Sequence, residues 1–173
     1  PVMVKAFIAT EDSRFYEHHG VDPVGIFRAA SIALFSGHAS QGASTITQQL
    51  ARNFFLSPER KLMRKIKEVF LAIRIEQLLS KDEILELYLN KIYLGYRAYG
   101  VGAAAQVYFG KTVDQLTLSE IAVIAGLPKA PSTYNPLYSL DRATARRNVV
   151  LSRMLNEGYI TQQQYEKIGR AHV

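Results

Sequence analysis

The feature that most constrains the fold of this chain is a repeated signal for the start of a helix. In this signal a Ser or Thr and a Glu or Gln three residues later hydrogen-bond to each other's backbone amides at the first helical turn. It occurs at Ser80-Lys81-Asp82-Glu83, Thr117-Leu118-Ser119-Glu120 and Thr161-Gln162-Gln163-Gln164. Asp22-Pro23 and Ser57-Pro58 predict two further starts, since proline is favoured at the first helical position.

The segments that follow these starts have helical periodicity. Leu62, Ile66, Val69 and Ile73, for example, recur at a spacing of about 3.6 residues. Alternating apolar and polar runs long enough to form a sheet are missing, and Gly126-Leu127-Pro128-Lys129-Ala130-Pro131 predicts a helix end followed by a stiff loop. The sequence therefore predicts a mainly α fold.

The length of the chain predicts a single domain over residues 1–173, because 173 residues are enough for one hydrophobic core but too few to expect two independent cores. No uninterrupted apolar run reaches the roughly 18 residues that span a bilayer. The chain starts at Pro1 and ends at Val173 without an obvious terminating signal. We therefore expect a piece of a larger protein, with any membrane anchor or second domain outside it.

Several kinds of site have no support in the sequence. The absence of cysteine excludes disulfides, thiolate nucleophiles and cysteine metal sites. His18, His19, His38 and His172 have no metal-ligand spacing, so we expect no metal site built from protein ligands. Ser44 lacks a nucleophile-elbow context, and there is no phosphate loop of the nucleotide type. The formal charge of +6 favours an anionic partner, such as a phosphate ester, nucleic acid or acidic lipid.

Two dense polar clusters are the candidates for chemistry. The acid pair Glu11-Asp12 follows the apolar run Phe7-Ile8-Ala9, where partial burial could raise a carboxyl pKa toward values useful to a general base. Taken alone, such an acid pair is more often a solvated helix end. The segment 42–49, with Arg52 and Asn53 after it, offers hydroxyls and amides that suit sugar oxygens but also suit helix caps. Both interpretations of each cluster stay open on the residues alone.

Two helical segments also have a double interpretation. A helical wheel places Lys61, Arg64, Lys65 and Glu68 opposite the apolar stripe that begins at Leu62. This face is either an ordinary solvated surface with an Arg64–Glu68 pair or a clamp for a pyrophosphate. The segment 24–35 is apolar around most of its circumference with only Arg28 charged. The residues alone favour a buried core helix there over a membrane-interface helix.

Five motifs in order resemble the peptidoglycan glycosyltransferase domain of family 51, found in class A penicillin-binding proteins and in monofunctional transglycosylases. The resemblance covers essentially the whole chain and is strongest to the penicillin-binding protein 1a type. One departure is Arg52, where many relatives carry lysine. The motifs are Glu11-Asp12-x-x-Phe15-x-x-His18-x-Gly20, Gly42-x-Ser44-Thr45-x-Thr47-Gln48-Gln49, Arg64-Lys65-x-x-Glu68, Lys81-x-x-Ile84-Leu85-Glu86-x-Tyr88-Leu89-Asn90, and Gly126 to Pro131.

The resemblance implies a lysozyme-like helical lobe with a smaller, hydrophobic, membrane-facing jaw. Residues 24–42 would form this jaw and its mobile edge, which reverses the preference for a buried core helix. The domain would act at the outer face of the bacterial cytoplasmic membrane. An N-terminal transmembrane anchor and a C-terminal transpeptidase domain would lie outside this chain.

The implied reaction polymerises lipid II into β-1,4-linked glycan with inversion and release of undecaprenyl diphosphate. Glu11 would be the general base on the acceptor hydroxyl, and Glu68 would assist on the pyrophosphate side. Lys81, Glu86, Tyr88 and Asn90 are assigned to structure. Sugar and phosphate oxygens would be bound by Ser44, Thr45, Gln48, Gln49, Arg52, Asn53, Arg64 and Lys65, with Asp12, Phe15 and His18 supporting the first motif.

The implied partners are lipid II, the lipid-linked glycan chain, the membrane surface and the transpeptidase domain, and no nucleic acid. No cofactor is required, although Mg²⁺ or Mn²⁺ could assist at the diphosphate. A muramidase or lytic transglycosylase acting on finished glycan is an alternative. A non-catalytic basic helical module that binds polyanions is another.

Overall fold

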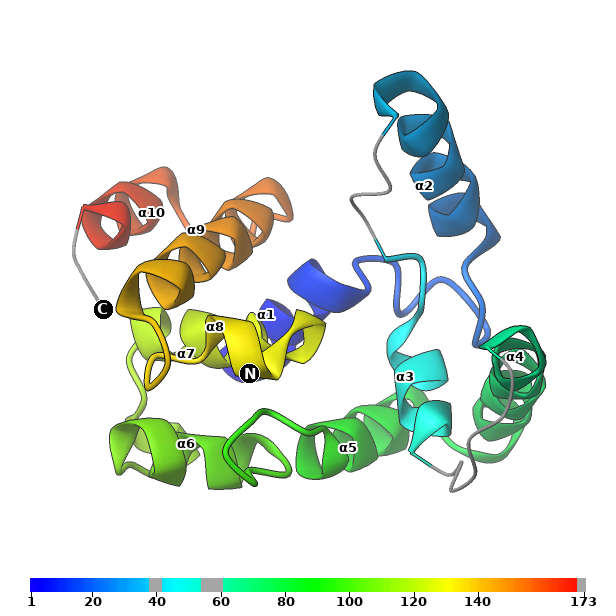
Figure 1. Cartoon of the computed structure of the whole chain (residues 1–173), viewed down its shortest axis with the longest axis horizontal. Helices are drawn as coiled ribbons and strands as arrows, with labels where there is room; N and C mark the ends of the chain where they lie inside the picture. Colours follow the sequence, from blue (N-terminus) through cyan, green and yellow to red (C-terminus); the bar gives the residue numbers. More distant parts are fainter. Residues whose placement is uncertain (38–41, 54–60, 171–173) are drawn as a thin grey trace. The chain divides into compact units, whose positions relative to one another are not determined.

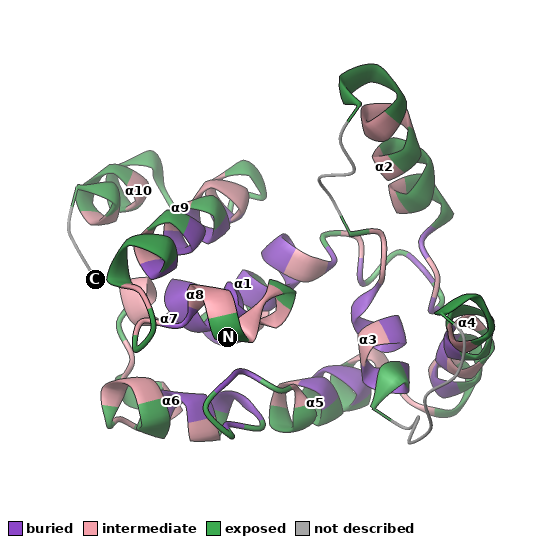
Figure 2. Cartoon of the chain, viewed as in Figure 1, coloured by how far each residue is buried: buried purple, intermediate pink, exposed green. Residues whose placement is uncertain are grey.

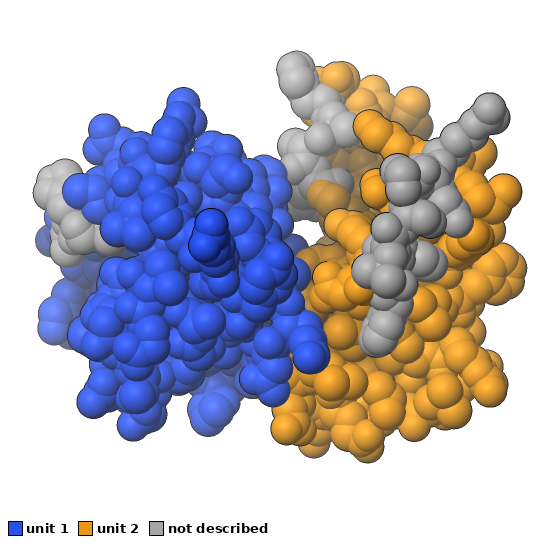
Figure 3. Space-filling model, turned by 60° about the horizontal axis from the view of Figure 1, so that its bottom comes forward, with its two compact units in different colours: residues 1–13, 89–173 blue, residues 14–88 orange. Residues whose placement is uncertain are grey.

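The computed structural model describes residues 1–37, 42–53 and 61–170 of the chain. It divides into two compact units, shown in different colours in Figure 3. Unit 1 comprises residues 1–13 and 89–173, and unit 2 comprises residues 14–88. The prediction that the whole chain forms one domain stays a prediction.

Helices dominate the described residues, and no strand occurs among them (Figure 1). An isolated backbone bridge joins Tyr93 to Tyr99. The predicted mainly α fold is confirmed. The α-helices are α1 (Val2–Glu11), α2 (Pro23–Ser36), α3 (Ile46–Arg52), α4 (Lys61–Leu78), α5 (Lys81–Lys91), α6 (Val101–Phe109), α7 (Leu118–Ala125), α8 (Pro131–Tyr134), α9 (Leu140–Asn156) and α10 (Gln162–Gly169), and the 3₁₀ turns are η1 (Val113–Gln115) and η2 (Leu127–Lys129).

The core of unit 1 is built from α1, α7 and α9, which pack against one another. Buried residues cover most of α1 and α7, as the purple ribbon of Figure 2 shows. On α9 the buried apolar face is Val150, Leu151 and Met154, at the i, i+1 and i+4 spacing of one helical side. This core fixes the last turn of α1, which ends at Glu11.

In unit 2, helix α3 packs against α4. The loop that carries the first motif approaches α4 at Gly20, whose φ is +109°. A Cβ atom on Gly20 would lie 2.9 Å from the carbonyl oxygen of Ala72. Only glycine combines this backbone conformation with so close an approach.

Most of the predicted helix starts are confirmed. Thr117 and Thr161 form complete capping boxes at α7 and α10, and the Ser80 Oγ accepts a hydrogen bond from the Glu83 amide at 3.2 Å. Helix α2 begins at Pro23 as predicted, but the Asp22 side chain makes no cap bond and instead accepts from Arg14 Nε at 3.2 Å. The predicted start at Ser57-Pro58 lies outside the described residues.

The interpretation of 24–35 as a buried core helix is wrong, because α2 has no buried residue. Phe35 is 94% exposed, and Phe27 and Leu34 are also largely exposed. Figure 2 accordingly shows α2 without purple. The part of the proposed jaw at 38–41 lies outside the described residues.

The orientation of α4 also differs from the simplest interpretation of its helical wheel. Its apolar stripe is the exposed side, with Leu62 at 75% exposure. Glu68 is only 2% exposed and shares the buried face with Ala72 and Ile75. Periodicity located the two faces correctly but could not say which one packs against α3.

Arg147 on α9 provides a stability prediction for unit 1. Its fully buried guanidinium donates to Ser119 Oγ at 3.2 Å and to the Ile168 carbonyl at 3.2 Å, linking α9 to α7 and α10. Arg147→Ala removes these bonds and leaves a cavity, so we expect a loss of about 3 kcal/mol, or roughly 5–10 °C in Tm. Thermal unfolding followed by circular dichroism measures this. The exposed Arg170→Ala is the control, and equal Tm values for the two variants would contradict the prediction.

Candidate active site

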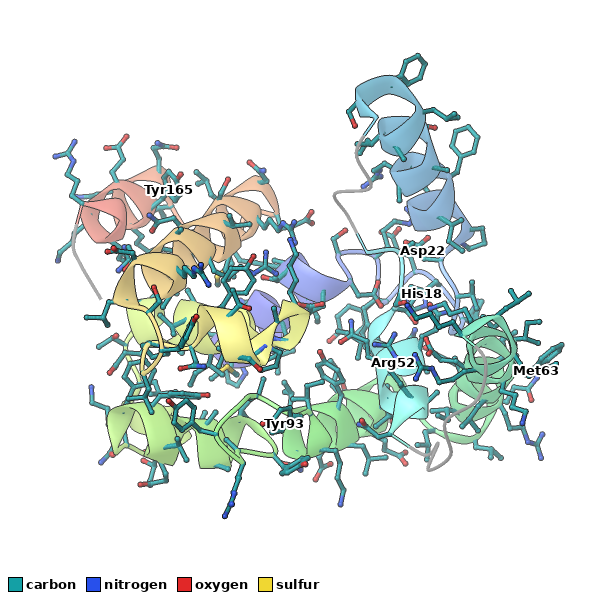
Figure 4. The ribbon with its side chains drawn as sticks, viewed as in Figure 1. His18, Asp22, Arg52, Met63, Tyr93 and Tyr165 are labelled. Atoms are coloured by element: carbon teal, nitrogen blue, oxygen red, sulfur yellow. The ribbon has the colours of Figure 1, made fainter. Side chains whose placement is uncertain are left out.

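Glu68 is the centre of a charged cluster in unit 2. Arg52, labelled in Figure 4, lies at the end of α3. It donates to the Glu68 carboxylate from Nε at 3.1 Å and from Nη2 at 3.3 Å. Lys65 donates from Nζ at 2.9 Å. Although the carboxylate is buried, the Arg52 and Lys65 side chains are each nearly half exposed. The cluster therefore exposes two cations to solvent and anchors both to one buried carboxylate.

The ionisation of Glu68 follows from these contacts. Burial alone would raise its pKa, but the hydrogen bonds and charges of Arg52 and Lys65 outweigh burial and bring the pKa below its ordinary value. The carboxylate stays charged at neutral pH. Two fixed cations beside a permanent anion can bind a diphosphate and stabilise charge that develops on it.

Ser44 and Arg64 differ in their relation to this cluster. The Lys65 Nζ also donates to Ser44 Oγ at 2.6 Å, so Ser44 joins the cluster directly. Arg64 is half-buried on α4, and it supplies none of the three hydrogen bonds to Glu68 described above. The helical pair at Arg64 and Glu68 that the spacing offered is replaced by Lys65, three residues before Glu68.

Thr45 and Gln48 are held in structural contacts. They form the capping box of α3, in which the Thr45 amide donates to Gln48 Oε1 at 2.8 Å. Thr45 Oγ1 also donates to the Gly20 carbonyl at 2.6 Å, and both side chains are buried. Gln49 Oε1 accepts from the Tyr88 hydroxyl at 2.9 Å, whereas Asn53 is exposed at the C-terminal cap of α3. Of this group, Asn53 is the most accessible to a ligand.

The second part of the first motif, Phe15 and His18, is held by a buried ionic network within unit 2. Lys81 Nζ donates to the His18 carbonyl at 2.8 Å and to Glu76 Oε1 at 2.8 Å, and it lies 4.3 Å from the centre of the Phe15 ring. Thr47 Oγ1 donates to the same Glu76 oxygen at 2.7 Å. These contacts support a structural role for Phe15, His18 and Lys81. Glu76 lies in none of the five motifs, and only its buried contacts with Thr47 and Lys81 reveal its role.

Glu11 lies in unit 1, as the last residue of α1. It is only partly accessible, and Arg146 Nη2 on α9 lies 4.0 Å from its Oε1. Arg146 is buried and donates from Nε to the Gly126 carbonyl at 3.1 Å, which joins Glu11 to the start of the fifth motif. Asp12, also buried, caps the helix with its amide bonded to the Ile8 carbonyl.

Arg146 is a neighbour of Glu11 that the sequence did not predict. Burial lowers its pKa, and the charge of Glu11 opposes that shift. The available signal was the pair Arg146-Arg147 on the same helix as the buried Val150. Two arginines on a buried helical face indicate specific acceptors inside the fold, because an unpaired buried cation is costly.

A metal site built from protein ligands is not found among residues 1–37, 42–53 and 61–170, where no three acidic or histidine side chains gather. His38 and His172 lie outside these ranges. Assistance by Mg²⁺ or Mn²⁺ at a bound diphosphate stays a prediction.

Comparisons with known proteins agree with the motifs. A family model described as Transglycosylase matches residues 1–155. The chain is 92% identical over 167 residues to penicillin-binding protein 1A of Escherichia coli K12, and 68% identical over 164 residues to that of Haemophilus influenzae, covering 96% and 95% of this chain. It spans about a fifth of the length of these relatives, 20% and 19%.

A solved structure is also similar. The crystal structure of penicillin-binding protein 1A from Haemophilus influenzae aligns with a TM-score of 0.53 and 52% identity, covering 74% of this chain and 16% of that chain. The family resemblance inferred from the five motifs is confirmed. The roles assigned to individual site residues stay predictions.

Proposed function

Because the chain belongs to the transglycosylase family, we propose that it is a peptidoglycan glycosyltransferase that polymerises lipid II into β-1,4-linked glycan. The observation that carries this proposal is the Glu68 cluster, a buried carboxylate holding two half-exposed cations. Such a cluster fits the diphosphate of a lipid-linked sugar, whereas an uncharged glycosidic link needs no such clamp.

In the proposed reaction the 4-hydroxyl of the acceptor sugar attacks the anomeric carbon of the lipid-linked glycan. Glu11 accepts the hydroxyl proton as the new C–O bond forms. The bond from the anomeric carbon to the diphosphate breaks, and its electron pair leaves with undecaprenyl diphosphate. The single displacement inverts the anomeric configuration. Arg146, bonded to Gly126 and close to Glu11, positions the base.

Arg52 and Lys65 stabilise the charge that develops on the departing diphosphate, because both cations are already held in place before the reaction begins. Glu68 fixes the two cations through its three hydrogen bonds. Ser44 and Asn53 contribute further oxygen and amide contacts. Thr45 and Gln48 act indirectly, by holding the start of α3 in place.

The exposed apolar side chains of α2 support a lipid-facing role for this part of the proposed jaw, at the outer face of the cytoplasmic membrane. In the part of the chain that the structure describes, no helix is both long and apolar enough to cross a bilayer. The much greater length of the relatives supports a membrane anchor and a transpeptidase domain in the full protein.

Lipid II in detergent is the substrate that tests this proposal. We expect the purified chain to convert it into long glycan and to leave finished glycan strands intact. A muramidase or lytic transglycosylase would instead shorten finished glycan and leave lipid II unchanged, which would overturn the proposal. A polyanion-binding module would consume neither substrate and would bind any polyanion in a salt-dependent way.

A further inference from the structure

A hollow in unit 1 has no role in the reaction proposed above. Its volume is about 560 Å³, and it lies between the loop after α5 and the region of α8 and α9. Figure 4 labels Tyr93 on that loop. Its aromatic and polar walls include Tyr93, Tyr96, Ser132, Thr133, Tyr138 and Arg142.

The loop that supplies two of these tyrosines is strained. Tyr96 and Arg97 both have positive φ, +46° and +59°, within a turn closed by the Ala98 amide on the Gly95 carbonyl at 2.8 Å. Turns of this type favour asparagine and glycine, so a tyrosine and an arginine there cost conformational energy. The strain is maintained in a turn that places Tyr96 at the wall of the hollow.

The same loop packs closely against the opposite wall, at the start of α8. Gly95 packs so closely that a Cβ atom would lie 3.0 Å from the Pro131 carbonyl oxygen, at the start of α8. Buried Asn135 donates to the same carbonyl at 2.8 Å and accepts from the Tyr138 amide at 2.8 Å. Close packing of the loop on α8 and the hydrogen bonds of Asn135 therefore fix the residues that line the hollow.

The side chains that face the hollow keep hydrogen-bonding capacity for a ligand. The Arg142 guanidinium lies 5.7 Å from the centre of the Tyr138 ring. Across residues 1–37, 42–53 and 61–170 the Arg142 guanidinium has no carboxylate partner beside this ring contact, and the hydroxyls of Tyr93, Tyr96 and Tyr138 have no hydrogen-bond partner. These groups offer flat apolar faces, phenol hydroxyls and one unpaired cation.

We propose that this hollow binds a saccharide that carries a peptide carboxylate. The tyrosine rings match the apolar face of a sugar, their hydroxyls match its rim, and Arg142 matches a carboxylate. The source of such a ligand rests on the proposed function, since the substrate and the growing glycan both carry peptides. The site is separate in its residues from the Glu11 and Glu68 groups.

Binding of N-acetylmuramyl dipeptide, followed by NMR titration of the isotope-labelled protein, tests the proposal without any enzymatic turnover. We expect saturable shifts confined to the hollow. Arg142→Gln should weaken binding about tenfold or more, as for loss of a charge-assisted hydrogen bond. The dipeptide methyl ester should lose a similar factor on the wild type. Tyr138→Leu should weaken binding while leaving the carboxylate preference unchanged.

The exposed Arg170→Gln carries the same charge change outside the hollow and should bind like the wild type. Binding of the sugar-free dipeptide as strongly as the full probe would overturn the saccharide part. Equal binding of acid and ester, or no saturable shifts, would overturn the site. Lipid II polymerisation in the same preparation separates these failures from failure of the proposed function.

Discussion

Glu11→Gln is expected to abolish polymerisation of lipid II while leaving the helical content unchanged. Glutamine keeps the shape of the side chain but cannot take up the proton of the attacking hydroxyl. General-base catalysis contributes about 10²- to 10⁴-fold to such reactions. Glu11 ends α1, whose buried face is made by other residues, so the substitution leaves the core of unit 1 intact. The rate of glycan formation and the far-ultraviolet circular dichroism spectrum measure the two effects.

The matched control is Glu157→Gln, at the exposed C-terminal cap of α9. It removes the same charge from unit 1 and should polymerise lipid II at the wild-type rate. A Glu11→Gln protein as fast as this control would remove Glu11 from the mechanism.

Glu68→Gln is expected to lower the polymerisation rate by about 10²-fold, a typical cost of disturbing preorganised charge in an active site. Donor binding should be partly retained, because Arg52 and Lys65 keep their charges. Glu120→Gln is the control: Glu120 is also paired with a lysine, at 2.8 Å from Lys111, and glutamine preserves its capping box. Loss of donor affinity with normal turnover at saturation would show that Glu68 serves binding alone.

The Glu68 carboxylate also makes the stability of the fold depend on pH. The Glu68 pKa is lowered in the folded state from its ordinary value of 4.5, so the unfolded chain binds the proton more readily. The charged cluster therefore stabilises the fold fully above pH 4.5, and this contribution is lost as the pH falls through the lower, folded pKa. Urea unfolding should give a difference in unfolding free energy between the wild type and Glu68→Gln. We expect this difference to shrink as the pH falls below 4.5. A constant difference would mean that the carboxylate is not held charged by Arg52 and Lys65.

The helical architecture was accessible from sequence because helix starts depend on local chemistry. Thr117 and Thr161 need only a partner three residues away, so their capping boxes could be read directly. The exposed side of α4 could not be read in this way. A wheel separates Leu62 from Glu68, but tertiary packing decides which side is covered, and here the side of Glu68, Ala72 and Ile75 is covered.

The candidate site was likewise predictable where it depends on local motifs and not where it depends on tertiary packing. Glu68, Arg52 and Lys65 were identified from motifs, but the hydrogen bonds that join them depend on α3 packing against α4. Arg146 was missed because its partner Glu11 is distant in sequence. Glu76 was missed because its contacts with Thr47 and Lys81 depend on tertiary packing. Thr45 and Gln48 were assigned to ligand binding although their spacing also matched a capping box. Residue types alone gave no means of choosing between these two uses.

Helix α2 has a consequence for how this chain unfolds. None of its residues is buried, so the rest of the protein does little to hold it helical. A free helix of 14 residues is only marginally stable in water, even with Pro23 at its start and Gly37 at its end. In lipid-free buffer the amide hydrogens of α2 would exchange far faster than those of α7 or α9. A denaturation curve recorded on α2 would then report the local helix–coil balance, and only a probe in a packed helix would report loss of the fold.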